Sequence, residues 1–450
     1  MSTTPANIWW RRARGLWSRW RFNKGGRDGS APWRPGRHGH SPSASQRSAE
    51  VPSEVDLFAK CTDFTTPAEL QQLGIYPYFH PISESDGTEV EIRGQRLVMV
   101  GSNNYLGVTQ DARVREAAMQ AISRYGPGCT GSRFLNGTLE MHEELEERLA
   151  HFLGRERVLV FTTGFQTNLG VISSLVQRND TIFTDRENHA SIMDGCRLSF
   201  GSIKKFAHND IEALAQQLKR HRDQRRGGQL IVVDGVFSML GDICELPPIV
   251  ELAKRHGARV LVDDAHAVGV LGANGRGTAE HFGIDDKVDL VLGTFSKSFG
   301  SIGGYVAGDE DVIRYVKHHG RAMIFSAALP PASVAATLAA LDIIEQEPER
   351  RTKLMENADF LRRSFQELGF DTGPSCTPIV PLIIGGREPT FRFWRELYDN
   401  GVFTNPITAP AVPSGMDLIR TSVMATHTRE QLEQVVKVVA KAARKLRLVA

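Results

Sequence analysis

Four polar segments hold the side chains with the greatest chemical potential in this chain, and each follows a short apolar run. They are residues 185–191, 234–238, 263–266 and 294–298. Ligands of sheets with alternating strands and helices bind at the carboxyl ends of the strands, so we expect these segments to meet at one sheet edge. They would gather a lysine amine, carboxylates, two imidazoles and several hydroxyls there.

Three residues of these segments have ordinary explanations when each is taken alone. Lys297 fits a surface lysine, Asp263 a helix cap and His189 a hydrogen-bonded loop residue. The combination is more specific, because a lysine between hydroxyl residues and glycines can form a Schiff base, and a nearby aspartate can pair with a pyridinium nitrogen. The imidazole of His189 would lie flat on the pyridine ring that carries this nitrogen.

A phosphate site is indicated where a helix is predicted to start. The backbone amides of Gly164 and Phe165, with the hydroxyl of Ser296, would surround an anion there. An amine, a carboxylate, an imidazole and phosphate donors are the requirements of pyridoxal 5'-phosphate (PLP) catalysis.

The elements that must position these groups alternate along the chain. Predicted strands are residues 158–161, 181–184, 203–206, 230–233, 259–262 and 290–292, with 303–307 as one more. Predicted helices cover residues 111–125, 247–256, 352–368 and 428–446, and another starts with a capping-box pattern at 209–212. The alternation predicts an α/β fold with a mostly parallel sheet covered by helices.

The composition and the pattern of apolar residues along the chain predict four regions. They are a basic tail at 1–50, an N-terminal arm at 51–95, a large domain at 96–345 and a smaller α+β domain at 346–450. The last region contains short β-like pieces such as 379–384 between its two helices.

The composition restricts the compartment and the class of protein. Hydrophobic residues make up 41% and charged residues 24% of the 450 residues, as in globular proteins, and no apolar run approaches the length of a membrane span. The five cysteines are scattered without a C-x-x-C pair, so neither a disulfide framework nor a zinc site is indicated. We therefore expect a reducing, cytoplasmic compartment.

The charge is concentrated in the tail. Residues 1–48 carry a net charge of +9 and five of the six tryptophans, which leaves −7 on the remainder. A negative body is a poor match for nucleic acid, so no nucleic-acid partner is expected. The Trp- and Arg-rich tail suits contact with an anionic membrane surface, and a disordered extension or an organellar transit peptide are the alternatives.

Eight stretches resemble, in the correct order, the α-oxoamine synthases of the fold-type I PLP superfamily. The resemblance covers roughly residues 70–445, and the stretches are 104–107, 131–133, 163–168, 189–191, 235–239, 263–266, 294–298 and 420–422. It implies a PLP-dependent transferase that condenses an amino acid with an acyl thioester and releases carbon dioxide. It also implies a homodimer with the active site at its interface.

The resemblance assigns a role to each matching position. Lys297 is similar to the lysine that holds the cofactor and moves the α-proton, Asp263 to the partner of the ring nitrogen, and His189 to the stacking imidazole. The other implied contacts are His266 and Ser238 to the phenolic oxygen, Thr294, Ser296, Gly164 and Phe165 to the phosphate with Ser326 from the second subunit, Arg420 to the substrate carboxylate, and Asn104 and Tyr105 to the substrate.

Three neighbours of these positions depart from the family pattern. Asp264 and Ala267 stand where members commonly carry Glu and Ser, and Thr426 replaces a common alanine or acidic residue. These changes tune the pocket and leave the implied mechanism in place.

The branch of the family is indicated by residues 128–138, which resemble the serine palmitoyltransferase branch. This implies condensation of L-serine with a long-chain acyl thioester to give 3-ketosphinganine, in sphingolipid biosynthesis. The alternatives are 8-amino-7-oxononanoate synthase, which uses L-alanine and a pimeloyl thioester, and glycine C-acetyltransferase. The acyl carrier, coenzyme A or an acyl carrier protein, stays open.

Two readings from other classes are less favoured. A catalytically silent regulatory subunit would not need Lys297, Asp263 and His189 together, and all three are present. An adaptor protein that acts through its basic tail is the other.

Overall fold

The structure is a computed structural model that describes residues 56–222 and 227–449. The chain divides into two compact units, residues 1–64 and 65–450. The described part of the first unit contains the short helix α2 (Ala59–Thr62). The predicted basic tail at 1–50 lies outside the described residues. All the elements below belong to the second unit.

A seven-stranded sheet forms the centre of the second unit. Its strands are β4 (Arg157–Phe161), β5 (Thr181–Asp185), β6 (Ser202–Phe206), β7 (Gln229–Asp234), β8 (Arg259–Asp263), β9 (Leu290–Thr294) and β10 (Gly304–Gly308). The spatial order is β4-β10-β9-β8-β7-β5-β6, and β10 alone runs antiparallel to its two neighbours. The predicted α/β fold with a mostly parallel sheet is confirmed, with strand ends shifted by at most two residues.

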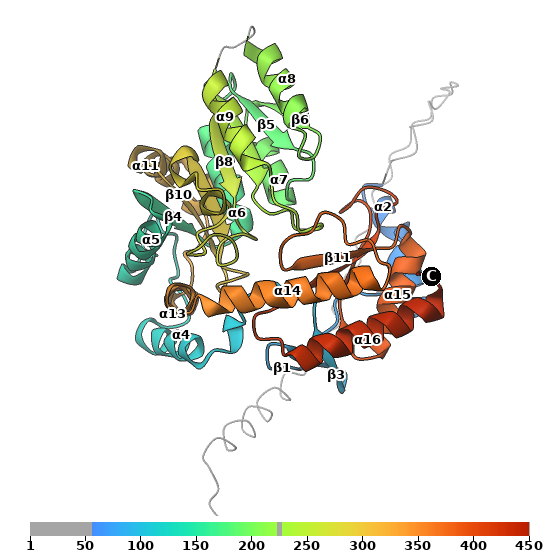
Figure 1. Ribbon diagram of the computed structural model, residues 1–450. Helices are drawn as coiled ribbons and strands as arrows, with labels where there is room; N and C mark the ends of the chain where they lie inside the picture. Colours follow the sequence, from blue (N-terminus) through green and yellow to red (C-terminus); the bar gives the residue numbers. More distant parts are fainter. Residues whose placement is uncertain (1–55, 223–226, 450) are drawn as a thin grey trace, which may run out of the picture. The chain divides into compact units, whose positions relative to one another are not determined.

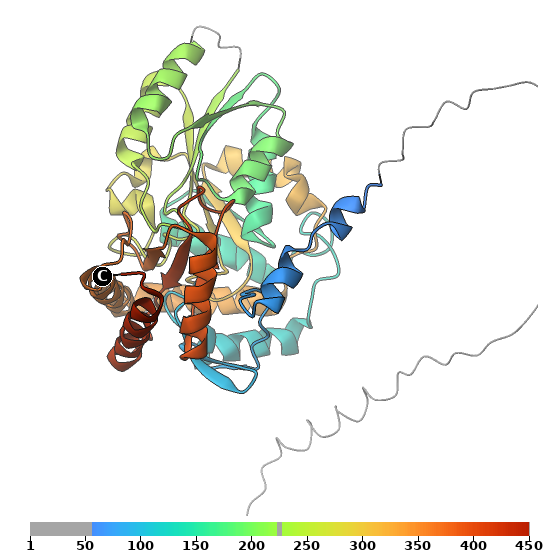
Figure 2. The ribbon, with the colours of Figure 1, turned by 90° about the vertical axis from the view of Figure 1, so that its right-hand side faces the viewer.

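Helices cover both faces of this sheet, as the double-sided apolar runs require (Figures 1 and 2). One face packs against α8 (Ile211–Arg222) and α9 (Leu246–His256), and the other against α6 (Gly164–Leu175), α7 (Ala190–Leu198) and α11 (Glu310–His319). Strand β7 shows the alternation. Its Ile231 and Val233 belong to the α8–α9 side and its Leu230 and Val232 to the other side, all at 7% exposure or less.

Further helices complete the body. They are α3 (Thr66–Gln72), α4 (Ala112–Tyr125), α5 (Glu140–Leu153), α10 (Thr278–His281), α12 (Arg321–Ile324) and α13 (Pro331–Gln346), with single 3-10 turns at Val108–Gln110 and Asp285–Lys287. Helix α4 matches the prediction for 111–125, and Asp111 caps it by accepting a hydrogen bond from the Arg113 amide.

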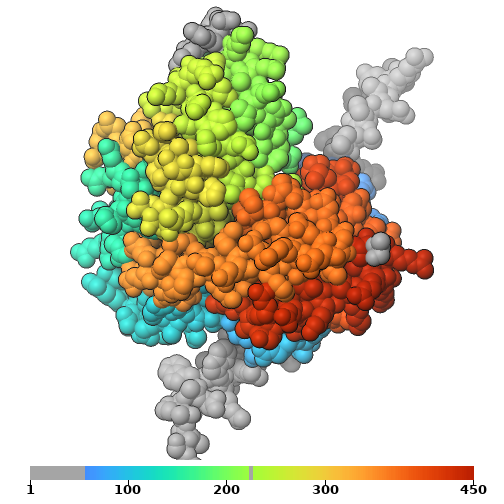
Figure 3. Space-filling view, viewed as in Figure 1, coloured from blue at the N-terminus to red at the C-terminus, as the bar shows by residue number. Residues whose placement is uncertain are grey.

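The C-terminal residues form helices and small strands, as predicted. They comprise α14 (Glu349–Glu367), α15 (Arg387–Asp399), α16 (Arg429–Leu446) and the antiparallel sheet of β11 (Ile379–Ile383), β14 (Leu418–Ser422) and β13 (Asn405–Ile407). In Figure 3 their side chains form a continuous orange and red surface.

The third sheet joins residues far apart in the sequence. It consists of β1 (Glu84–Ser85), β2 (Glu89–Ile92), β3 (Gln95–Met99) and β12 (Val402–Phe403), in that order. Strand β12 pairs in parallel with β3. Segments of the predicted arm and of the predicted small domain therefore share a sheet, and the predicted domain boundaries stay a prediction.

The start of α8 differs from the predicted capping box. Asp210, and not Asn209, caps the helix, since its Oδ1 accepts a hydrogen bond from the Ala213 amide. Asn209 has a positive φ of 50° and directs its side chain to Asp242 and Ile243. The predicted helix start is wrong by one residue, because the Asn209 side chain bonds to long-range partners instead.

Membrane-spanning helices are absent from the described part of the chain, where no helix combines the necessary length and apolar character.

The contact between β10 and the start of α6 leaves no room for a side chain. A Cβ on Gly304 would lie 2.7 Å from the Cα and 2.9 Å from the N of Gly164. We expect Gly304→Ala to force the two elements apart and to lower the free energy of unfolding by about 1–3 kcal/mol in urea denaturation. The control Gly128→Ala meets open space and should change it by less than about 0.5 kcal/mol. Equal stability of the two variants would contradict this packing.

Candidate active site

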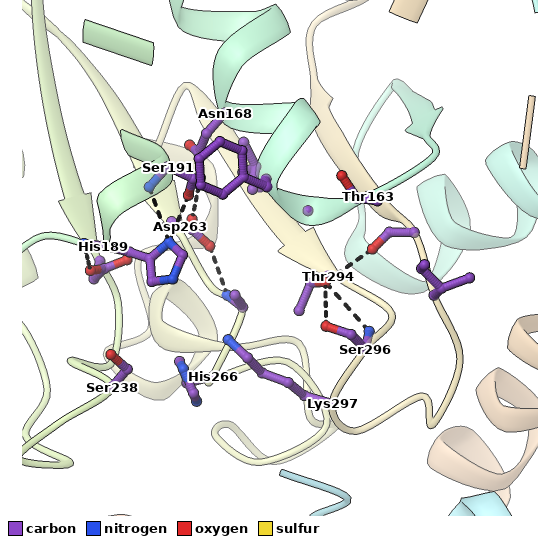
Figure 4. A pocket seen from close by; sticks show the side chains of 17 residues that line it. Thr163, Asn168, His189, Ser191, Ser238, Asp263, His266, Thr294, Ser296 and Lys297 are labelled. Carbon is purple, nitrogen blue, oxygen red and sulfur yellow. Dashed lines mark hydrogen bonds between the residues drawn. The ribbon is translucent and has the colours of Figure 1, made fainter. Parts of the chain in front are cut away.

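A cavity of about 340 Å³ lies where β7, β8 and β9 end (Figure 4). The last residues of β7 and β8, Asp234 and Asp263, are direct partners across the sheet, and both face the cavity. Nine of the predicted site residues line it. These are Gly164, Phe165, His189, Ser238, Asp263, His266, Thr294, Ser296 and Lys297. The expected convergence at one sheet edge is confirmed.

Both carboxylate oxygens of Asp263 accept hydrogen bonds. Oδ2 accepts from Asn168 Nδ2 at 2.7 Å, and Oδ1 accepts from the Ala265 amide at 3.0 Å. The side chain is buried, and its orientation is fixed from α6 and from its own loop. Such a carboxylate is held ready to pair with a buried positive charge.

His189 caps α7 and is held by a short hydrogen-bond chain. Its Nδ1 accepts from the Ser191 amide and lies 2.7 Å from Ser191 Oγ, which in turn accepts from Asn168 Nδ2. Burial lowers the pKa of His189, so the ring is neutral at physiological pH. A neutral, oriented imidazole can stack on an aromatic ligand.

The amine of Lys297 reaches into the cavity from the loop after β9 (Figure 4). Burial lowers its pKa to about 8, although the carboxyl groups of Asp263 and Asp234 act in the opposite direction. A substantial fraction of the amine is therefore neutral near pH 8, as a nucleophile or base must be.

His266 is oriented by the tyrosine of the 104–107 stretch. Tyr105 Oη lies 2.7 Å from His266 Nδ1. Burial lowers the pKa of His266 well below its usual value and raises that of Tyr105, so both groups are neutral. Tyr105 does not line the cavity, and its predicted contact with the substrate stays a prediction.

The residues predicted to bind a phosphate lie together at the N-terminus of α6. A Cβ on Gly164 would lie 2.7 Å from Thr294 Oγ1, so the glycine lets the backbone approach that hydroxyl. The Oγ atoms of Thr294 and Ser296 are 3.0 Å apart. Backbone amides at a helix start and hydroxyl groups are donors that suit a phosphate, and the predicted phosphate contacts stay a prediction.

Arg420 lies on β14, buried, with its guanidinium close to the cavity loops. Its Nε donates to the Ser238 carbonyl at 2.6 Å and its Nη2 to Asn103 Oδ1 at 3.0 Å. It touches a residue that lines the cavity without lining it itself. Its predicted role as a carboxylate clamp stays a prediction.

Two other predicted residues also lie outside the cavity lining. Asn104 uses its side chain locally, because Nδ2 donates to Thr109 Oγ1 and Oδ1 accepts from the Val108 amide. Ser326 Oγ accepts from Gln166 Nε2 of the same chain at 3.0 Å. Their predicted roles are a substrate contact and a phosphate contact across a dimer, and both stay predictions.

Three residues of the site lie in segments singled out in the sequence, but no role was predicted for them. They are Asn168 and Ser191, which orient Asp263 and His189, and Asp234, which accepts the His189 amide at 2.7 Å. A usable signal existed for Asp234, since it directly follows a predicted strand, as Asp263 does. Asn168 lies one turn into a helix, where a polar residue carries no distinctive pattern.

The whole donor set fits a flat, cationic ring that carries a phosphate. Phosphate donors at α6, the stacking face of His189, the Asp263 carboxylate and the Lys297 amine surround one cavity. Nothing among the described residues forms a cluster of His, Cys, Asp and Glu suited to a metal ion.

Comparison with known proteins agrees with this geometry. The family model for aminotransferase class I and II matches residues 95–439. The chain belongs to this family.

Two types of enzyme are represented among the named relatives. A serine palmitoyltransferase of Sphingobacterium spiritivorum is 50% identical over 86% of this chain and 96% of its own length. An 8-amino-7-oxononanoate synthase of Thermoanaerobacter pseudethanolicus is 43% identical over 85% of this chain and 96% of its own. A solved structure of SPT with the PLP internal aldimine superimposes with a TM-score of 0.85 at 36% identity, over 88% of this chain and 100% of that one. Both enzyme names belong to α-oxoamine synthases, so the resemblance drawn from the motifs is confirmed.

The lowered pKa of Lys297 predicts a pH-dependent stability. The lysine titrates near 8 in the folded protein and near 10.5 when unfolded, so between these values the unfolded chain binds more protons and stability rises with pH. We expect ligand-free Lys297→Met to be more stable than wild type at pH 7, by about 3 kcal/mol. The difference should disappear by about pH 10.5, measured by urea denaturation. A difference that is constant with pH would contradict the assignment.

Proposed function

We propose that this chain is a PLP-dependent acyltransferase that condenses L-serine with a long-chain acyl thioester to give 3-ketosphinganine and carbon dioxide. The observation that carries this proposal is the amine of Lys297 in one cavity with Asp263 and the neutral imidazole of His189. Relatives at 46–50% identity named serine palmitoyltransferase support the choice of substrates.

The residues of the cavity divide the work of holding the cofactor. The amides of Gly164 and Phe165 and the hydroxyls of Thr294 and Ser296 would bind the phosphate. Asp263 would pair with the ring nitrogen, His189 would stack on the ring, and His266 and Ser238 would face the phenolic oxygen. When bound, PLP supplies a ring that withdraws electrons from the α-carbon of the amino acid.

Proton movement falls to the amine of Lys297. Its neutral form can take the α-proton of the amino acid and return it, since its pKa of about 8 lies close to physiological pH. Asp263 would hold a proton on the nitrogen of the bound ring, because its hydrogen bonds from Asn168 and Ala265 fix the carboxylate in place.

Arg420 would bind the carboxylate of the amino acid. Its guanidinium offers the planar, bidentate geometry that suits a carboxylate. In this structure its donors are directed to protein oxygens, so substrate binding exchanges them.

The choice of substrates can be tested with a matrix of substrate pairs. We expect thiol release with serine and palmitoyl-coenzyme A, and far less with alanine and pimeloyl-coenzyme A or with glycine and acetyl-coenzyme A. Lys297→Ala should reduce turnover by at least about a thousandfold, because no other neutral amine lies in the cavity lining.

The outcomes separate the alternatives. Preference for alanine and pimeloyl thioester would assign the chain to the 8-amino-7-oxononanoate synthases, which are also among its relatives at 42–44% identity. A parallel assay with palmitoyl acyl carrier protein in place of palmitoyl-coenzyme A shows which acyl carrier the enzyme uses. Turnover retained by Lys297→Ala would refute the mechanism.

We infer a homodimer as the working assembly. Large apolar side chains stay exposed on the single chain, among them Leu135 at 78% and Phe325 at 75%. Phe325 precedes Ser326, the residue expected to reach the phosphate of the second subunit, so an interface over this segment would bury the exposed ring.

We also infer that residues 1–48 contact an anionic membrane surface and place the enzyme peripherally in the cytoplasm. The support is their net charge of +9 with five tryptophans. The full chain should co-sediment with phosphatidylglycerol vesicles, and a chain that lacks residues 1–48 should not. Added salt should weaken the binding. Equal sedimentation of the two chains would exclude this contact.

A further inference from the structure

His208 is held between two carboxylates outside the cavity. Its Nδ1 lies 3.2 Å from Asp185 Oδ1, and its Nε2 lies 2.9 Å from Asp242 Oδ2. The two carboxylates are almost completely buried, and the imidazole is 25% exposed. The mechanism above gives no role to these three residues.

The charge of the His208 ring follows from its two carboxylate partners. Burial acts to lower the pKa of His208, but the hydrogen bonds to Asp185 and Asp242 outweigh it and raise the pKa to about 10. The ring is therefore an imidazolium at physiological pH and donates from both nitrogens. Glu187 is a further acidic residue beside the ring, in the small pocket that they both line.

The two carboxylates lie on two of the segments that carry proposed cofactor contacts. Asp185 ends β5, and the turn after it leads to His189. Asp242 belongs to the loop after β7, which also contains Ser238. His208 comes from the β6–α8 connection, so one side chain ties three connections of the sheet together.

Neighbouring contacts reinforce the tie. The Asn209 amide donates to Asp185 Oδ2 at 2.8 Å, and Asn209 Nδ2 donates to Asp242 Oδ2 at 3.1 Å. The ring of Phe237 meets the His208 ring edge-on at 4.3 Å between centroids. Because Phe237 directly precedes Ser238, the position of the imidazolium is transmitted to the cavity wall.

Ser238, which lines the cavity, also contacts Arg420, the residue proposed to bind the substrate carboxylate. The Ser238 carbonyl accepts from Arg420 Nε at 2.6 Å. A shift of the Ser238 loop therefore moves an anchor of the residue proposed to bind the substrate carboxylate.

We propose that His208 is a positioning residue: bridging Asp185 and Asp242, it fixes the loops of His189 and Ser238 and so sets cofactor affinity and the orientation of Arg420. The expected effect on serine binding rests on the proposed function, whereas the expected effect on PLP affinity does not rest on the choice of substrate.

The test compares His208→Phe with a matched loss of a buried histidine elsewhere. His427 is 1% exposed, accepts the Met424 amide and lies outside the cavity lining, so His427→Phe is the control. PLP affinity is measured on the cofactor-free full-length chain by equilibrium dialysis. Serine affinity is measured on the loaded enzyme from the absorbance of the cofactor, and kcat and KM follow with palmitoyl-coenzyme A.

We expect His208→Phe to weaken PLP affinity and to raise KM for serine, each about tenfold, with a smaller change in kcat, as for other residues that orient a direct ligand contact. His427→Phe should lower thermal stability and leave both affinities within about twofold. His208→Lys, which keeps the positive charge, should recover PLP affinity to within about threefold of wild type.

Unchanged PLP and serine affinities in His208→Phe, or equal changes in His427→Phe, would overturn the proposal. If His208→Phe does not fold, Asp242→Asn removes one carboxylate charge at constant shape and should shift both affinities in the same direction. Because PLP and serine binding need no acyl thioester, wild type that turns over no acyl substrate would count against the proposed function and not against this inference.

Discussion

The structure depends on the direct pairing of Asp234 with Asp263 across β7 and β8, which places two carboxyl groups side by side at a buried sheet edge. Burial, followed by the neighbouring Asp263, raises the pKa of Asp234 well above its usual value, so Asp234 holds a proton more readily than an exposed aspartate does. The two carboxyl groups accept hydrogen bonds from different donors. Asn168 and the Ala265 amide donate to Asp263, whereas the His189 amide donates to Asp234. Asp263 is therefore held in one orientation near the amine of Lys297, whose pKa is lowered.

Close backbone packing supports this arrangement. A Cβ on Gly235 would come within 2.3 Å of Thr278 Oγ1 and still closer to Asp264 Oδ1, so the chain after β7 passes directly over the buried Asp264. Thr278 donates to both oxygens of that carboxyl through its amide and hydroxyl. Burial nevertheless raises the pKa of Asp264 to about 7. The departure from the family pattern at this position thus fills a tight, fully hydrogen-bonded site.

The large sheet and most of the cavity were predictable from the sequence for one reason. Strands buried on both faces appear as apolar runs, and the polar residues of the site follow these runs immediately. Lys297, Asp263 and His189 were accessible in this way. The rest depends on distances along the chain that no local pattern encodes. Asp185 and Asp242 are separated from His208 by 23 and 34 residues. The local engagement of Asn104 and the cap at Asp210 depend on competition between partners, which only three-dimensional packing decides.

The occupied guanidinium of Arg420 has a consequence for the course of turnover. If Arg420 binds the substrate carboxylate as proposed, its hydrogen bonds to Ser238 and Asn103 would compete with the incoming carboxylate, and the affinity for an amino acid would be the difference between two sets of bonds. The same competition would favour departure of the product, because a product that has lost its carboxylate would leave the guanidinium free to return to the protein's own oxygens.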